Sequence, residues 1–342
     1  MRRRGAGRRP RPAGAGRSRE RGPLSGSGGL DALLAGVRAG RPRAVGRLIS
    51  LVEDGSAALP SIMAALAPDT GRAFVVGVTG PPGAGKSTTV TALVRALRAR
   101  GERVGVLAVD PTSPFTGGAL LGDRVRMQEH ALDDEVLIRS MATRGHLGGL
   151  AVAAPQALRV FDAAGCATVV VETVGVGQSE VDVAAAADAA VVLLAPGMGD
   201  GVQAAKAGIL EIGDLFVVNK ADRDGAQPLV RELRSMVGLA DRPPGAWKPP
   251  VLTTVASEGT GVPELLDALD RFRVAQAASG DQARRRLQRS RREVEGLALA
   301  TLAGRLRREG SAALDDLAAA VRDGGTDPYA AAAALLARTD LR

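Results

Sequence analysis

The feature that most constrains the fold is a glycine-rich turn between an apolar run and a helical stretch. Residues 74–89 read FVVGVTGPPGAGKSTT, and their centre fits the pattern G-x-x-x-x-G-K-[S/T]. Glycines allow backbone N–H groups to turn inward around a phosphate, and the following helix directs its positive end to the same place. We therefore predict a phosphate-binding turn, a P-loop, made by Gly80, Gly83, Ala84, Gly85, Lys86, Ser87 and Thr88. Lys86 is expected to bridge the β- and γ-phosphates as a catalytic residue, and Ser87 to ligate Mg²⁺.

Short apolar runs rich in β-branched residues alternate with helical stretches along the middle of the chain. These runs lie at 74–80, 103–110, 135–140, 167–173, 189–196, 215–222 and 250–257. Most of them are continuously apolar, which is typical of strands that are covered on both faces. We predict an α/β protein with a doubly wound, mainly parallel sheet of the P-loop NTPase type and with helical extensions at both ends of the chain.

Basic residues are concentrated at the N-terminus. The chain has a formal net charge of +8, and residues 1–22 hold nine arginines against one glutamate, so the remaining residues are neutral. A neutral folded part does not favour nucleic-acid binding. Because this stretch lacks large apolar residues after Met1, residues 1–24 are expected to be a disordered, solvated arm. A mitochondrial transit peptide and an arm for RNA or acidic surfaces are the alternatives.

The rest of the chain divides into three predicted segments. Residues 25–70 carry apolar side chains at helical spacings and form an N-terminal helical extension. Residues 71–262 hold the alternating strands and helices and form the P-loop domain. Residues 263–342 are helical throughout and form a C-terminal extension. Its apolar stripe consists of Leu287, Val294, Leu297, Leu302 and Leu306.

Cysteine and histidine are rare in this chain. The single cysteine, Cys166, excludes an intrachain disulfide and fits a reducing compartment, so a cytoplasmic location is expected. No apolar run reaches the roughly 18 residues that a membrane helix needs, so no membrane association is predicted. We expect Cys166 to be a small buried side chain and His130 to be a solvated helix residue. His146 lies in a loop beside Arg144 and is a candidate functional residue.

A magnesium-bound nucleotide needs a carboxylate in addition to the P-loop. Two apolar runs end on acids, Asp110 and Glu172, at the strand ends where open α/β sheets bind ligands. Glu172 precedes a glycine-rich segment suited to sensing the γ-phosphate, with Gly175, Gly177 and Gln178 as candidate switch residues. Asp123 is a third acid, on a loop that could reach the metal. Helix capping is the alternative role for the first two acids, and a solvated loop position is the alternative for Asp123.

A second motif indicates which base is bound. Asn219, Lys220 and Asp222 form an N-K-x-D pattern after an apolar run. The carboxylate of the aspartate can accept two hydrogen bonds from guanine, whereas adenine offers no matching pair of donors. A site of this kind can reject the wrong base by roughly 10⁴-fold. The run at 250–257 ends on Ala256 and Ser257, whose backbone could contact the guanine oxygen. The residues alone therefore predict a protein that binds GTP with Mg²⁺ and switches with its hydrolysis.

Four longer stretches resemble a known family. They read VDPTSPFTGGALLGDRVRM (109–127), TRGHLGGLA (143–151), ETVGVGQSE (172–180) and GDGVQAAKAGILEIGDLFVVNKAD (199–222). Together with the P-loop they are similar to the MeaB/ArgK/MMAA family, which consists of P-loop GTPases of the SIMIBI class. The resemblance runs from about residue 25 to the C-terminus. Members of this family serve adenosylcobalamin-dependent methylmalonyl-CoA mutase.

The resemblance implies a function and a set of roles. Such proteins are homodimers formed in part by the C-terminal helices, and they use GTP to gate cobalamin loading into the mutase and to protect or reactivate it. Asp110 and Asp123 would be linked to the metal and the first switch, and Glu172 to hydrolysis. The segment 197–213 would be the loop that responds to the mutase, with Asp200, Gln203 and Lys206.

Three other classes of protein remain as alternatives. A GTPase metallochaperone for nickel or zinc shares the fold and the guanine motif, but it needs clusters of Cys or His, and this chain has one cysteine and two histidines. A P-loop kinase needs an acceptor site and a base, for which no motif is visible. A scaffold with an inactive P-loop is disfavoured by the intact Lys86 and Ser87. The partner could also be a related acyl-CoA mutase, such as an isobutyryl-type enzyme.

Overall fold

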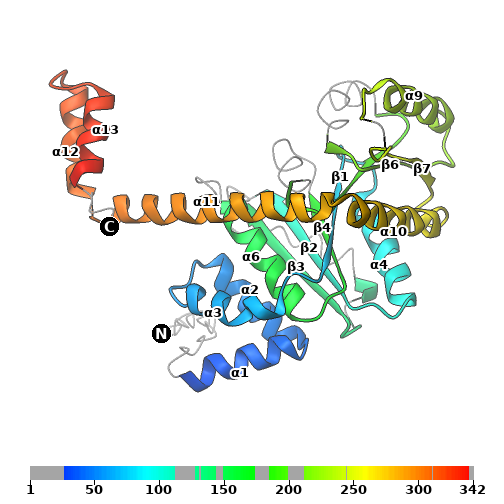
Figure 1. Ribbon diagram of the computed structural model, residues 1–342, viewed down its shortest axis with the longest axis horizontal. Helices are drawn as coiled ribbons and strands as arrows, with labels where there is room; N and C mark the ends of the chain where they lie inside the picture. The colour runs from blue at the N-terminus through cyan, green and yellow to red at the C-terminus, as the bar shows by residue number, and fades with distance from the viewer. Residues whose placement is uncertain are drawn as a thin grey trace, which may run out of the picture.

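The computed structural model describes eight parts of the chain. They are residues 27–111, 128–130, 132–143, 149–173, 185–198, 212–243, 245–309 and 311–338. The predicted N-terminal arm, residues 1–24, lies outside them. The described residues form a central twisted sheet with helices on both faces, and a long helix, α11, that crosses the molecule and extends beyond the sheet (Figure 1).

Each apolar run in the sequence forms a strand, as predicted. The strands are β1 (Phe74–Thr79), β2 (Val104–Pro111), β3 (Val136–Thr143), β4 (Thr168–Thr173), β5 (Ala189–Leu194), β6 (Leu215–Asn219) and β7 (Val251–Thr254). They form one seven-stranded sheet in the order β3-β2-β4-β1-β5-β6-β7, and all neighbouring strands are parallel. The doubly wound sheet is therefore confirmed, and β1, which precedes the glycine-rich turn, lies at its centre.

Helices cover both faces of this sheet. The α-helices are α1 (Ser27–Arg38), α2 (Pro42–Glu53), α3 (Leu59–Leu66), α4 (Lys86–Ala99), α6 (Gly149–Ala163), α9 (Ala226–Leu239), α10 (Val262–Ser279), α11 (Asp281–Glu309), α12 (Ser311–Arg322) and α13 (Pro328–Arg338). Short 3-10 helices span Ala67–Asp69 (η1) and Gln128–His130 (η2). The core on one face joins α1–α3 and α6 to alternate residues of β2, β3 and β4, and the core on the other face joins α4 and α10 to the intervening residues. Because successive strand residues point to opposite faces and both faces are covered, the strands are apolar throughout.

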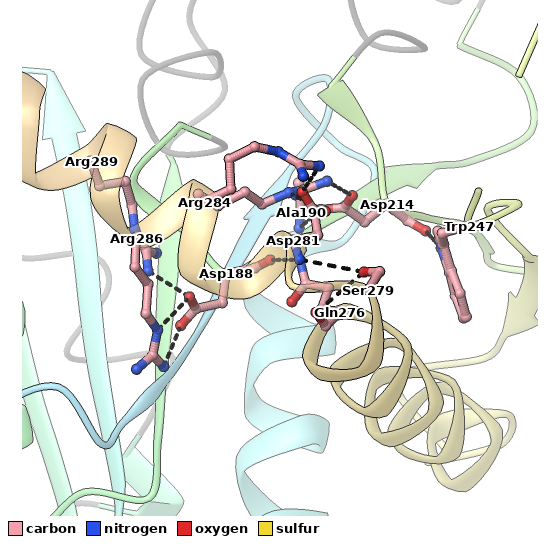
Figure 2. A network of polar contacts seen from close by, with 11 residues as sticks. Asp188, Ala190, Asp214, Trp247, Gln276, Ser279, Asp281, Arg284, Arg286 and Arg289 are labelled. Atoms are coloured by element: carbon pink, nitrogen blue, oxygen red, sulfur yellow. Dashed lines mark hydrogen bonds and ion pairs between the residues drawn. The ribbon is translucent and has the colours of Figure 1, made fainter. Parts of the chain in front are cut away.

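Asp188, which directly precedes β5, connects α11 to the amino edge of the sheet (Figure 2). Asp188, only 1% exposed, accepts a hydrogen bond from the backbone N–H of Val75 at 2.9 Å, which extends the ladder between β5 and β1. The same carboxylate forms ion pairs with Arg286 and Arg289 of α11. Two guanidinium groups and a backbone donor thus compensate for the burial of this charge.

A second aspartate repeats this arrangement one strand further along. Asp214 accepts a hydrogen bond from the backbone N–H of Ala190 at 2.9 Å and two from Arg285 of α11, at 2.9 and 3.0 Å. Burial raises the pKa of the Asp214 carboxyl, and the bonds from Arg285 act in the opposite direction. As a result, α11 is attached to the amino ends of β5 and β6, and the carboxyl end of β6 carries the predicted base-reading motif.

Both His130 and Cys166 are buried, which contradicts the prediction for His130 and confirms the one for Cys166. His130 is not a solvated helix residue: it is 8% exposed, and its Nε2 atom lies 3.2 Å from the carbonyl oxygen of Thr91. The sequence does not predict this burial, because the neighbours of His130 are polar. In the structure, η2 packs against α4. Cys166 is buried as predicted, at 3% exposure.

Within the described residues, no helix is long and apolar enough to cross a membrane.

Candidate nucleotide-binding site

The glycine-rich turn connects the central strand to α4 at the carboxyl edge of the sheet. Gly80 has a φ of 136°, and a Cβ atom at this position would lie 2.1 Å from the carbonyl oxygen of Leu193. Gly85 has a φ of 92°, and a Cβ atom there would lie 2.3 Å from Nδ2 of Asn219. Because both backbone conformation and space exclude a side chain, only glycine allows this shape of turn.

Lys86, the first residue of α4, places its ammonium group inside this turn. The side chain is 7% exposed, and Nζ donates hydrogen bonds to the carbonyl oxygens of Gly80 at 2.6 Å and Pro81 at 3.2 Å. A buried cation surrounded by a loop and the amino end of a helix is a favourable environment for a phosphate. The position of Lys86 therefore suits the phosphate-binding role predicted for it.

Ser87 and Glu172 meet beside the turn. The hydroxyl of Ser87 donates a hydrogen bond of 2.5 Å to Oε1 of Glu172, which is 2% exposed at the end of β4. The register that pairs Val78 with Glu172 places this carboxylate alongside the end of β1. Hydroxyl and carboxylate oxygens are the hard ligands that Mg²⁺ prefers, so the residues present fit this ion.

The other predicted metal and switch residues are described only in part or not at all. The backbone of Asp110 pairs with Ala142 near the end of β2, at the same edge as Glu172, but its side chain is outside the described part of the structure. Further predicted residues that lie outside the described residues are Asp123, His146, Gly175, Gly177, Gln178, Asp200, Gln203 and Lys206.

Asn219 connects the predicted base-reading turn to the P-loop. Its Nδ2 atom donates to the carbonyl oxygen of Ala84 at 2.8 Å. Its Oδ1 atom accepts hydrogen bonds from Oγ1 of Thr254 at 3.0 Å and from the backbone N–H of Ala256 at 3.1 Å. One buried amide thus joins three loops of the carboxyl edge, those after β1, β6 and β7. The sequence pattern predicts Asn219 but gives no sign of the contribution of Thr254.

Lys220, the second residue of this motif, contacts the P-loop. Lys220 adopts a left-handed backbone conformation with a φ of 57°, and its Nζ donates to the carbonyl oxygen of Gly83 at 2.7 Å. Asp222 is exposed in the turn after β6, and Ser257 is exposed after β7. The backbone N–H of Ala256 is occupied by Asn219 in this structure. Asp222 is thus accessible to solvent in the turn after β6.

A cavity of about 600 Å³ lies over the P-loop. It is lined by Pro82, Gly83, Gly85, Lys86, Ser87, Thr88, Thr91, Glu172, Thr173 and Lys220. Its volume is within the range of small-molecule sites. The sequence patterns do not predict Thr91 or Thr173, although Thr91 lies one helical turn after Ser87 and Thr173 directly follows Glu172. A parallel sheet with this turn and cavity at its carboxyl edge defines a P-loop nucleoside-triphosphate-binding protein.

Comparison with known proteins identifies the family. Residues 45–311 match the family model described as "Methylmalonyl Co-A mutase-associated GTPase MeaB". A relative from Pyrococcus horikoshii that is named as a GTPase is 46% identical over 308 residues, which are 89% of this chain and 96% of the relative. The chain belongs to the MeaB family of P-loop GTPases. The resemblance found in the sequence motifs is thereby confirmed.

Two further proteins show similarity over different lengths. The mouse protein named "Methylmalonic aciduria type A homolog, mitochondrial" is 42% identical over 216 residues, covering 62% of this chain and 52% of the relative. A crystal structure described as a "LAO/AO transport system kinase" superposes with a TM-score of 0.67 at 28% sequence identity, covering 92% of this chain and 98% of the other. The similarity in structure therefore extends over nearly the whole chain.

Proposed function

We propose that this protein binds and hydrolyses Mg²⁺-bound GTP, and that this cycle gates adenosylcobalamin loading into methylmalonyl-CoA mutase or a related acyl-CoA mutase. The same cycle would protect or reactivate the mutase. The observation that carries the nucleotide part is the buried amide of Asn219, which unites the phosphate-binding turn and the guanine motif in one site. The mutase part is supported by the description of the matching family, which names this enzyme.

The described residues suggest how the terminal phosphate is handled. Lys86 would transfer its hydrogen bonds from the loop carbonyls to the β- and γ-phosphate oxygens. Ser87 and Glu172 would hold Mg²⁺, with Asp110 and Asp123 as further ligands or positioning acids. When bound, the metal neutralises charge on the phosphates. Glu172 is also the proposed catalytic residue, because among the described residues that line the cavity it is the one that carries a carboxylate.

Guanine specificity is proposed to come from Asp222. An aspartate carboxylate accepts from both N1–H and the exocyclic amine of guanine, and an adenine base would leave it without these donors. Asn219 would maintain the distance between this base site and the P-loop. The backbone of Ala256 and Ser257 would complete the base pocket, and the N–H of Ala256 would then exchange the Asn219 oxygen for the guanine oxygen.

The proposed partner protein would set the rate of GTP hydrolysis. A P-loop GTPase without a completed transition-state clamp hydrolyses GTP slowly, on the order of 10⁻⁴ to 10⁻² per second. A mutase that orders the segment containing Gly175, Gly177 and Gln178, or the segment with Asp200, Gln203 and Lys206, would accelerate the reaction. By linkage, the bound nucleotide must then change the affinity for the mutase.

The test is GTP turnover by the full chain, measured with and without purified, cobalamin-loaded methylmalonyl-CoA mutase. We expect the mutase to accelerate phosphate release and to co-elute with the protein in gel filtration in a nucleotide-dependent way. The Lys86→Ala variant should show neither turnover nor acceleration. Absence of both acceleration and a complex would refute the mutase role and leave the GTPase assignment intact.

Phosphoryl transfer to another acceptor is the second candidate, since the structurally similar protein is described as a transport system kinase. The same turnover experiment with γ-labelled GTP distinguishes the two. Label recovered wholly as inorganic phosphate supports a GTPase, and label on protein or on a small molecule supports a kinase. Metallochaperone activity is disfavoured by the sequence itself, which has one cysteine and two histidines.

We also propose a homodimer and a cytoplasmic location. The dimer is supported by large apolar side chains that stay exposed on α11, α12 and α13. They are Leu287, Val294, Leu297, Leu299, Leu314, Tyr329 and Leu336. The location is supported only by the use of a single cysteine, which fits a reducing compartment.

A further inference from the structure

A second cavity lies on the face of the sheet that α6 covers, between α6 and α11, which pass side by side (Figure 1). Its volume is about 490 Å³, which is within the range of small-molecule sites. Its wall includes Ala73 and Val75 at the amino end of β1 and Asp188 directly before β5. No described residue lines both this cavity and the one over the P-loop, so the two can be occupied independently.

Small side chains leave this space open. Ala154 and Pro155 of α6 line it, together with Ala185 and Ala186 of the segment before β5. Pro155 lies inside α6, where a proline cannot donate the backbone hydrogen bond of a regular helix. The surface of the cavity is mainly apolar. An occupant with an apolar body would therefore be favoured, because binding removes apolar surface of both partners from water.

The acidic groups in the wall are already satisfied by donors of the protein. The Asp162 carboxylate accepts hydrogen bonds from the backbone N–H groups of residues 71–73. Asp188 is held by Val75 and the arginines of α11, as described above. Glu293 accepts two hydrogen bonds from the guanidinium group of Arg159, at 3.0 and 2.6 Å. A cationic ligand would have to displace these bonds, so the acids do not form a cation site.

The basic groups in the wall retain unused donors. Arg289 bonds to the carbonyl oxygen of Ala186 and to the Asp188 carboxylate, which engages two of its five N–H groups within the described part of the chain. Arg292 is exposed and makes no hydrogen bond or ion pair with a described residue. The two arginines are three residues apart on α11 and are therefore neighbours on its surface. Among the described residues of the wall, four arginines face three acids, so an anion is favoured.

We propose that this cavity binds a small organic carboxylate with an apolar body. The carboxylate pairs with Arg292 and with the unused donors of Arg289, and the body packs against α6 and the start of β1. A guanidinium group can donate two parallel hydrogen bonds to a carboxylate, which suits this ligand. A phosphate ion would leave the apolar wall without a partner, and an uncharged apolar molecule would leave the arginines without one. The inference does not depend on the proposed GTP cycle.

The experiment is a ligand-observed NMR titration of the full chain with three probes. Octanoate carries the charge and the apolar body, octanamide keeps the body without the charge, and inorganic phosphate has a charge without the body. Arg292→Ala removes the unpaired guanidinium group, and Arg292→Lys keeps its charge. Arg291→Ala is the matched control, because Arg291 is an exposed neighbour on the same helix and is not among the described residues of the wall.

For the wild type we expect octanoate to bind with a dissociation constant on the order of 1 mM or below, as is usual for a ligand of this size. Octanamide should bind at least about fivefold more weakly, and phosphate should not bind measurably. Arg292→Ala should weaken octanoate about fivefold and leave octanamide within about twofold of the wild type, which is the scale of a partly exposed charge-assisted bond. Arg292→Lys should lie between these values, and Arg291→Ala should match the wild type.

A variant that fills the cavity locates the site. Ala185 is half-buried in the wall, so Ala185→Leu places a larger side chain in the space. It should abolish binding of both octanoate and octanamide. Its affinity for a non-hydrolysable GTP analogue with Mg²⁺ should equal that of the wild type, which also shows that the variant is folded.

Several outcomes would overturn the inference. They are no binding of octanoate by the wild type, equal binding of octanoate and octanamide, or binding of phosphate as tight as that of octanoate. An equal loss in Arg291→Ala and Arg292→Ala would show attraction by the charge of α11 in general, and normal binding by Ala185→Leu would place the ligand elsewhere. If the chain binds the GTP analogue but not octanoate, only this inference fails. If it binds octanoate but no guanine nucleotide, the proposed function fails and this inference stands.

Discussion

At the scale of single residues, the candidate site depends on side chains that pack against backbone. Asn219 fits against Gly85 so closely that any side chain at position 85 would displace it. Its amide then fixes Ala84 on the P-loop and Ala256 on the last loop of the sheet. Lys86 is similarly constrained by the carbonyl oxygens of its own turn. Such groups can be prepositioned for a ligand because the surrounding backbone leaves them little freedom.

Cys166 provides a prediction about pH at this scale. Burial raises the pKa of its thiol from 9.0 to about 12. Below pH 9 the thiol keeps its proton in both the folded and the unfolded chain. Between pH 9 and 12 the unfolded chain loses this proton and the folded chain does not, so stability falls as the pH rises. By pH 10.5 this group alone should lower the free energy of unfolding by about 2 kcal/mol.

The measurement is denaturant unfolding at a series of pH values for the wild type and for Cys166→Ala. The variant starts with a lower free energy of unfolding because of the cavity left by the sulfur, but its decline between pH 9 and 10.5 should be shallower. Parallel declines of the two proteins would contradict the raised pKa of the thiol.

At the scale of elements, the sequence predicts local features well and distant contacts poorly. The strands could be predicted because a buried parallel strand is a continuous apolar run, and the P-loop could be predicted because its shape needs glycines at fixed spacing. The attachment of α11 could not, because Asp188 and Arg286 are 98 residues apart and each resembles an ordinary surface charge in the sequence. For the same reason the burial of His130 could not be predicted, because it depends on the packing of η2 against α4.

A prediction at this scale concerns the attachment of α11 through Arg285. Its guanidinium group bonds to the Asp214 carboxylate, whose side chain is 9% exposed, and also lies over the ring of Phe272. Arg285→Ala should lower the free energy of unfolding by about 2–3 kcal/mol, which is less than for a fully buried pair because the arginine is partly exposed. Arg284→Ala is the matched control. Arg284 is 73% exposed and pairs only with Asp281 among the described residues, so its loss should cost less than about 0.5 kcal/mol.

Chemical denaturation of the two variants checks this prediction. Equal stability of Arg285→Ala and Arg284→Ala would show that the pair with Asp214 does not hold α11 to the sheet. The conservative variant Arg285→Lys should recover only part of the loss, because lysine cannot make both hydrogen bonds with the geometry of a guanidinium group.

At the scale of the whole molecule, the C-terminal part stands apart from the sheet. The hairpin of α12 and α13 lies at the far end of α11 and packs on itself and on the end of that helix (Figure 1). The outer side of α11 exposes Leu287 at 64% and Val294 at 67%, seven residues apart on the same helical face. A long helix that exposes such residues is expected to bury them against another protein, and we propose a second copy of this chain.

The prediction is a change in oligomeric state. Sedimentation velocity should show a dimer for the wild type. The double variant Leu287→Glu with Val294→Glu should raise the dissociation constant of the dimer at least about tenfold, because charges would enter an apolar contact. Gln288→Glu adds a negative charge on the same helix without removing an apolar side chain, and should leave the dimer intact. A wild-type chain that stays monomeric, or a double variant that dimerises normally, would contradict this proposal.

The most direct test of the central claim is a calorimetric titration of the purified chain with GTP and with ATP, each in the presence of Mg²⁺. Binding of GTP at one site per chain, with ATP at least about 100-fold weaker, is the result we predict, since the Asp222 carboxylate has matching donors only on guanine. A chain that binds neither guanine nucleotide, or that prefers ATP, would contradict the assignment of this cavity to GTP.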